Sequence, residues 1–188
     1  TGIDLYDFTG KLNKNKPDDS VVISDAGSAY YVCSQATGIK GNQRYITSSA
    51  QAEMGFTVPA CIGAAFAGSP CVIGVTGDGS LQMNIQELQT IKHHQLPIKL
   101  FVWNNGGYLS IRTTQKKFFE GREIGTDEDS GVSFPDLVRV AYAYDMDYIK
   151  VSDYDSLTPA LQTIFANDDP MIIEVMCQKW QEVIPTLQ

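Results

Sequence analysis

Short runs of apolar, often β-branched residues alternate along the chain with stretches of helical periodicity. This alternation limits the possible folds, because it is typical of parallel strands joined by crossover helices. The two central runs, CVIGVT at 71–76 and IKLFVW at 98–103, are almost entirely apolar, which predicts strands covered by helices on both faces. We therefore expect an α/β, three-layer, doubly wound domain with a six-stranded, mainly parallel sheet. Strands are expected at 21–24, 44–47, 71–76, 98–103, 148–151 and 171–176.

Helices are expected in the intervals between these strands. Small residues fill 55–67, where a helix could lie close against the sheet, and apolar residues recur at helical spacing across 81–91. Residues 134–145 and 156–167 have amphipathic patterns that predict two more helices. The polar stretch 112–133 has no sustained period, so we expect a long loop that could close over a ligand.

The bulk properties limit the domain organisation and the partners. A length of 188 residues suits one domain, and we expect a lead-in or linker segment at 1–19 and the domain at 20–188. A net charge of −8 argues against nucleic acids and anionic membranes, which require a cationic surface. The four cysteines are widely spaced, and no apolar run approaches the ~20 residues of a membrane-spanning helix. We expect reduced, structural cysteines in a soluble, cytoplasmic protein.

Gly77-Asp78-Gly79-Ser80 directly follows the strand expected at 71–76 and opens the next predicted helix. Backbone N–H groups at the start of a helix can bind an anion. Glycines on both sides of Asp78 would let a phosphate approach the backbone closely. A plain tight turn uses the same residue types, so this motif alone leaves both interpretations open.

A second polar group follows the next strand. Twenty-four residues separate Gly79 from Asn104-Asn105-Gly106-Gly107-Tyr108. Since neighbouring parallel strands open at the same edge of a sheet, Asp78 and Asn105 are expected to converge. Carboxylate, amide, backbone carbonyl and phosphate oxygens together suit Mg²⁺. The paired motifs therefore predict a metal-diphosphate site, although the second group alone could also be a turn.

These motifs resemble those of a known protein family. The stretch GDGSLQMNIQELQTIKHHQLPIKLFVWNN at 77–105 resembles the thiamine-diphosphate motif, in which GDG is followed by about two dozen residues and NN. Its amino-acid sequence is most similar to that of the acetolactate synthase large-subunit family. QRYITSSAQAEMGFTVPACIGAAFAG and VVISDAG resemble further segments of that family's C-terminal domain. The similarity runs from about residue 20 to 185 and implies the diphosphate-binding (PP) domain of a thiamine-diphosphate enzyme.

The resemblance implies roles for individual residues. Asp78 and Asn105 would be side-chain magnesium ligands, and Gly107 would add its backbone carbonyl. Met54 corresponds to the large apolar residue that wedges beneath the bent cofactor, whereas its sequence context alone would also suit an ordinary core position. The further residues expected to contact the cofactor are Gly27, Ser28, Ala29, Ala52, Gly79, Ser80 and Tyr108.

Within that set, residues 79–80 and the turn at 27–29 would meet the diphosphate, while main-chain groups of Ala52 and Met54 would contact the aminopyrimidine. Two departures from the family are visible. The family often has glycines where this chain has Ser-Ser-Ala-Gln at 48–51, and its GQH-like turn appears here as Gly-Ser-Ala at 27–29. Substrate or product specificity is expected to differ accordingly.

The resembled chemistry also needs an acid that protonates the cofactor's pyrimidine. In that family it is a glutamate on a separate pyrimidine-binding domain, usually of a partner subunit, and no segment here resembles it. We assign no catalytic role to Glu53 or Glu87. His93 and His94 lie at the far end of the helix that begins at the site. We expect surface positions for them rather than a general-base role, because a positive charge is favoured near the C-terminus of a helix. The chain is therefore expected to hold no catalytic residue and to be inactive alone.

Three functions remain open. The first is the half-site of an acetolactate synthase-like enzyme, a homodimer or homotetramer when complete, that decarboxylates pyruvate or a related 2-oxo acid and joins the fragment to a second carbonyl. FAD is possible in that full-length enzyme but is not expected on this domain. The second is a separate PP-domain subunit of a two-chain 2-oxo-acid decarboxylase. The third, a non-catalytic nucleotide- or flavin-binding module, is weak because the first strand lacks a GxGxxG turn and no GxxxxGK[ST] occurs.

Overall fold

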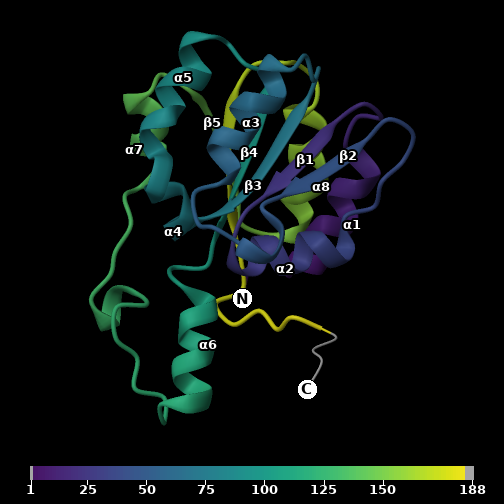
Figure 1. Ribbon diagram of the computed structural model, residues 1–188. Coiled ribbons are helices and arrows are strands. Elements are labelled where there is room, and N and C mark those ends of the chain that lie inside the picture. The colour runs from purple at the N-terminus through teal and green to yellow at the C-terminus, as the bar shows by residue number, and fades with distance from the viewer. Residues whose placement is uncertain (1, 185–188) are drawn as a thin grey trace.

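Six parallel strands form one sheet in the computed structural model, which describes residues 2–184 (Figure 1). The strand order is β2-β1-β3-β4-β6-β5, and every pairing is parallel. The expected sheet is thus confirmed, with each strand within one residue of its predicted bounds. The strands are β1 (Val21–Ser24), β2 (Arg44–Thr47), β3 (Val72–Gly77), β4 (Ile98–Asn104), β5 (Asp147–Val151) and β6 (Met171–Met176).

Helices cover both faces of the sheet (Figure 1), which confirms the three-layer, doubly wound arrangement. Along β4, Phe101 and Trp103 enter one buried cluster, whereas Leu100 and Val102 enter the other. This alternation follows from the two-residue period of a strand. The first cluster packs against α1 (Leu5–Asn15), α2 (Gly27–Ala36) and α8 (Tyr154–Ile164), and the second against α3 (Thr57–Phe66), α5 (Leu88–His93) and α7 (Leu137–Ala143).

The connection from β3 to β4 is broken into short pieces. Where the sequence predicts one helix over 81–91, the structure has α4 (Asp78–Leu81), a 3-10 segment η2 (Gln82–Glu87) and α5. The break lies at Asn84, whose φ of −138° is not helical. Its side-chain amide donates to the carbonyl of Gly55 at 2.9 Å. The kink therefore ties this connection to the loop that precedes α3.

Three helices were not predicted. Helix α1 lies in the expected lead-in segment 1–19, yet its Leu5, Phe8 and Leu12 are buried in the domain core. The domain boundary at residue 20 stays a prediction. Helix α2 begins at Gly27, so the expected turn at 27–29 is the first turn of a helix. Helix α6 (Leu109–Phe118) occupies the start of the expected loop 112–133, which is irregular only after residue 118 apart from η3 (Glu128–Ser130).

The strand order reverses between β1 and β3. The chain moves outward from β1 to β2, returns beside β1 as β3, and then continues to β4 on the other side. Such a reversal leaves a crevice at the carboxyl ends of the two strands, which is the usual ligand site of open α/β sheets. Asp25 follows β1 and Asp78 follows β3, so both aspartates stand at this crevice.

Two further expectations concern the whole chain. All four cysteines are free and buried, as expected for structural thiols. Within residues 2–184, none of the helices is long and apolar enough to cross a membrane.

Candidate functional site

A cavity of about 210 Å³ opens at the carboxyl end of the sheet. Its walls come from the segments that follow β1, β2, β3 and β4. The structure brings together every residue that the sequence analysis assigned to the cofactor or the metal, although their roles remain predictions. These residues are Gly27, Ser28, Ala29, Ala52, Met54, Asp78, Gly79, Ser80, Asn105, Gly107 and Tyr108.

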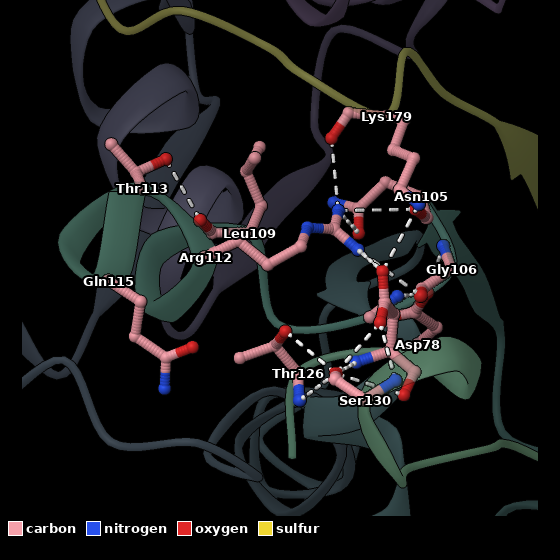
Figure 2. A network of polar contacts seen from close by, with 12 residues as sticks. Asp78, Asn105, Gly106, Leu109, Arg112, Thr113, Gln115, Thr126, Ser130 and Lys179 are labelled. Atoms are coloured by element: carbon pink, nitrogen blue, oxygen red, sulfur yellow. Dashed lines mark hydrogen bonds and ion pairs between the residues drawn. The ribbon is translucent and has the colours of Figure 1, made fainter. Parts of the chain in front are cut away.

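Asp78 joins the two predicted motifs. Its Oδ1 accepts from the backbone N–H of Gly79 at 2.7 Å. Its Oδ2 accepts from the N–H of Gly106 at 2.9 Å (Figure 2) and from that of Gly107 at 3.0 Å. The side chain is 4% exposed. Burial raises the pKa of Asp78 to about 6, although these N–H groups act in the opposite direction.

The Asp78 carboxylate is without a cationic partner. Within residues 2–184, no lysine or arginine lies at ion-pair distance from it. A buried carboxylate that lacks such a partner is costly, and a bound divalent cation would remove this cost. The carboxylate therefore fits a metal ligand.

The two asparagines have different tasks. The side-chain amide of Asn104 donates to Glu174 on β6 at 2.6 Å, and its Oδ1 accepts from the N–H of Gly106 at 3.0 Å. Asn104 thus anchors the turn to the sheet. Asn105 lines the cavity, and its Oδ1 accepts from Arg112 at 3.3 Å. Only the second asparagine of the pair is placed to meet a ligand.

Two positions in the site require glycine, because a neighbouring atom lies too close for a Cβ. A Cβ on Gly107 would lie 2.0 Å from the carbonyl oxygen of Thr126, and the residue has a φ of +148°. A Cβ on Gly79 would lie 2.2 Å from the ring of Tyr108. The sequence analysis explained Gly79 by the approach of a phosphate. The structure adds that the Tyr108 ring already covers this glycine.

Asp25 organises the opposite wall, and the sequence analysis missed it. Asp25 is fully buried and accepts from the hydroxyls of Thr76 at 2.9 Å and Ser80 at 2.7 Å. The N–H of Gly55 donates in turn to the Ser80 hydroxyl at 2.7 Å. The Ser80 side chain is therefore committed to the protein, and only its backbone N–H remains for an anion. The available signal was a polar residue directly after an apolar strand, the same signal that revealed Asp78.

The loop before α3 presents Met54 to the cavity. Met54 is 40% exposed and lines the cavity, so the alternative of an ordinary core position is wrong. Ser49 and Ala52 have left-handed backbone, with φ of +60° and +47°. Non-glycine residues adopt it at a cost of roughly 1–2 kcal/mol each. This strain falls beside and within 48–51, the segment in which the resembled family often has glycines.

The start of α2 supplies backbone donors to the cavity. The first N–H groups of a helix lack intrahelical partners, and the N-cap, Ala26, provides no side-chain hydrogen bond here. Ser28 and Ala29, in the first turn, line the cavity. Burial raises the pKa of the neighbouring Asp25, as it raises that of Asp78, so burial destabilises the charged form of both carboxylates.

The donor set limits the metal. Among residues 2–184, no group of three or more His, Cys, Asp and Glu side chains could hold a metal ion. The cavity instead offers one carboxylate, the amide of Asn105 and the carbonyl of Gly107. Hard oxygen donors of this kind suit Mg²⁺ when phosphate oxygens complete the shell.

Comparison with known proteins decides the family. The family model described as "Thiamine pyrophosphate enzyme, C-terminal TPP binding domain" matches residues 25–175. The chain belongs to this family. Its similarity to the large subunit of acetolactate synthase isozyme 2 from Escherichia coli K12 is 32% identity, over 93% of this chain and 32% of that protein. The acetolactate synthase large subunit of Lactococcus lactis IL1403 is also 32% identical, over 90% of this chain and 29% of that protein.

The fold of this TPP-binding domain is shared with a solved enzyme. The thiamine diphosphate-dependent 4-hydroxybenzoylformate decarboxylase of Rhodococcus jostii RHA1 matches with a TM-score of 0.84 and 26% sequence identity. The match covers 96% of this chain and 34% of that one. The family and fold expected from the GDG and NN motifs are therefore confirmed. The chain spans about a third of the length of these relatives.

Proposed function

We propose that this TPP-binding domain forms the Mg²⁺- and diphosphate-binding half of a thiamine diphosphate site in an acetolactate synthase-like enzyme. One observation carries the proposal. Asp78 is buried, and no lysine or arginine of the described residues lies at ion-pair distance from it. It shares a cavity with the oxygen donors Asn105 and Gly107 and with the open start of α2. This combination suits a divalent cation bound together with a diphosphate.

Three groups would hold the metal. Asp78 would contribute Oδ1, because this oxygen accepts one N–H group and keeps acceptor capacity, whereas Oδ2 already accepts two. Asn105 would contribute Oδ1, and Gly107 its backbone carbonyl. The diphosphate would lie beside residues 27–29 and 79–80. Its donors would be the N–H groups at 27–29 and the N–H of Ser80, because the Ser80 hydroxyl is engaged by Asp25 and the Gly79 N–H by Asp78.

The organic part of the cofactor would lie against apolar side chains. Met54 is exposed to the cavity from one wall and Tyr108 lines it from another. We infer that Met54 supports the bent cofactor and that main-chain groups of Ala52 and Met54 contact the aminopyrimidine. The strained backbone at Ala52 supports a functional role for this loop, because such strain concentrates at ligand sites.

Thiamine diphosphate, when bound, supplies an electron sink for the loss of CO₂ from a 2-oxo acid. This chain would bind and orient the cofactor and would not supply the acid that protonates the pyrimidine. Asp78 is the one acidic side chain among the described residues that line the cavity, and it is assigned to the metal. We therefore propose that a pyrimidine-binding domain, from the same or a second chain, contributes that acid, and that the assembly is a homodimer or homotetramer.

The relatives support a proposal for the substrate class. The acetolactate synthases and the 4-hydroxybenzoylformate decarboxylase support a 2-oxo acid as the substrate that is decarboxylated. Joining of the fragment to a second carbonyl is proposed from the acetolactate synthases alone. The alternative of a two-chain decarboxylase shares the first step. Incubation with pyruvate, with and without a second carbonyl compound, distinguishes the two reactions. Both release CO₂, but only the synthase forms the ligated product.

Calorimetry tests the site directly. In the native protein that carries this chain, Mg²⁺-dependent binding of thiamine diphosphate should weaken by more than about 100-fold in Asp78→Ala, since loss of a metal ligand exceeds the loss typical of an outer contact. Asp19→Ala, which removes an exposed carboxylate, is the matched control and should bind as the wild type does. Unchanged binding by a correctly folded Asp78→Ala protein would refute the site assignment.

A further inference from the structure

Arg112 is the largest fully buried side chain in the described part of the domain. It lies on α6, one turn after the Asn105–Gly106–Gly107 turn, and it is 0% exposed. The proposed roles toward the metal and the cofactor do not use it. Burial of a guanidinium is costly unless its donors are satisfied, so its partners indicate what it does.

The Arg112 guanidinium extends from α6 toward the second half of the site (Figure 2). One terminal nitrogen donates to the carbonyl of Gly106 at 3.3 Å. The other donates to the carbonyl and to Oδ1 of Asn105, both at 3.3 Å. The two terminal nitrogens, here called the fork, thus fix the backbone of the turn and the rotamer of the proposed ligand Asn105. A Cβ on Gly107 would lie 2.8 Å from the first nitrogen, so the turn packs directly on the guanidinium.

The same guanidinium holds two distant segments. Its second terminal nitrogen donates to the carbonyl of Lys179 at 2.9 Å, which is the shortest of its hydrogen bonds. Asp127 lies 3.8 Å from the first nitrogen and is bridged to the Lys179 ammonium at 3.1 Å. The ring of Trp180 lies over the guanidinium, with its centre 5.5 Å from the central carbon. Arg112 therefore contacts the asparagine turn, the loop after α6 and the C-terminal segment at once.

We propose that Arg112 is a positioning residue that holds Asn105 and Gly107 in the geometry for metal binding and couples this geometry to residues 177–184. The inference rests on the proposed metal site. Asn105 Oδ1 has a second lone pair, so it can face a cation while it accepts from Arg112. Displacement of the C-terminal segment would remove one partner of the fork and loosen the turn. A lysine could replace the charge but not the planar arrangement of donors, because one ammonium nitrogen with three N–H groups cannot reach all four of these acceptors.

The first test measures metal affinity in the native protein that carries this chain. In Arg112→Met and Arg112→Lys, the Mg²⁺ concentration for half-maximal thiamine diphosphate binding should rise about 10- to 100-fold, as is typical when the partner of a metal ligand is lost. Saturating Mg²⁺ should restore cofactor binding. Arg139→Met, at an arginine whose side chain is 88% exposed, is the matched control and should leave the Mg²⁺ dependence unchanged.

The second test needs no cofactor. Hydrogen exchange of the cofactor-free protein should accelerate in Arg112→Met at the amides of Gly106 and Gly107 and at residues 177–182. The amides of β3 and β4 should keep their wild-type protection. Accelerated exchange across β3 and β4 as well would show general loss of stability and would overturn a specific positioning role. If Arg112→Met does not fold, Arg112→Lys decides both tests.

The outcomes separate this inference from the proposed function. If the wild type shows no Mg²⁺-dependent binding of thiamine diphosphate, both are overturned. If the wild type binds and Asp78→Ala does not, the proposed site stands. In that case, a folded Arg112→Lys protein with wild-type Mg²⁺ dependence and wild-type exchange would overturn the positioning role alone.

Discussion

The two halves of the site are stabilised in different ways. In the corner between β3 and α4, Asp78 and Gly79 are neighbours in sequence, and their hydrogen bond is made where a buried strand meets a helix. The asparagine turn depends instead on Arg112, which reaches a carbonyl 67 positions away at Lys179. The Asp78–Gly79 contact is thus local in sequence, whereas the Arg112 contacts require a distant segment to assemble on the asparagine turn.

The two halves also differ in how deeply they are buried. Residues 72–76 and 78–81 are buried throughout. On α6 and the loop after it, four large apolar residues are between 50% and 68% exposed, although Leu109 is buried. We expect the α6 region to have the lower local stability, because it has fewer buried contacts. The exposed side chains are Ile111, Phe118, Phe119 and Ile124.

The largest effect is expected where the asparagine turn meets the loop. In Gly107→Ala the new Cβ would lie 2.0 Å from the Thr126 carbonyl, a backbone atom. We expect a loss of about 4 kcal/mol in the free energy of unfolding. Gly106→Ala is the matched control, because it also has positive φ but meets nothing within 4 Å. It should lose only about 1–2 kcal/mol. Equal losses in urea unfolding of the two cofactor-free variants would contradict the close packing.

The next effect concerns Asp78 and pH. Its folded-state pKa of about 6 lies above the unfolded value, so the folded state stays protonated to a higher pH than the unfolded state. Its contribution to stability is therefore fully present below about pH 4 and is lost as pH rises through about 6, with a total of about 3 kcal/mol. Measured in metal-free protein from pH 4 to 7, the wild type should lose this stability relative to Asp78→Asn. An unchanged difference between the two proteins would contradict the burial argument.

The smallest effect tests contact between the halves. Gly79→Ala would place a Cβ 2.2 Å from the Tyr108 ring, a side chain that can shift, so we expect a loss of about 2 kcal/mol. In a Tyr108→Ala background the same change should cost less than about 0.5 kcal/mol, since the obstructing ring is absent. Thermal unfolding of the four proteins gives the coupling free energy. Additive losses would show that the Tyr108 ring does not obstruct a side chain at position 79.

Much of the fold could be predicted from the sequence because the sheet is buried on both faces. Almost entirely apolar runs marked β3 and β4 within one residue, and polar residues at their ends located Asp78 and Asn105. These signals are local in sequence. They require no knowledge of which distant segments meet, so a single sequence was enough to predict them.

Helix α6 was missed for a specific physical reason. Its inward-facing buried positions are Leu109 and Arg112, so half of the apolar pattern is an arginine. Periodicity of apolar residues cannot reveal a helix whose buried face is charged. The partners of Arg112 lie on other segments, and their approach is decided by tertiary packing. The Asp25 network was missed likewise, because Ser80 and Thr76 meet Asp25 only after the sheet forms.

The Arg112 contact with Lys179 is made to a main-chain oxygen, which every amino acid carries. Substitutions at position 179 can therefore accumulate during evolution without any compensating change at position 112. Residue covariation, which reports side chains that change together, would leave this contact undetected, although it links the asparagine turn to the C-terminal segment. The signal should appear instead between positions 179 and 127, where the Lys179 ammonium meets the Asp127 carboxylate.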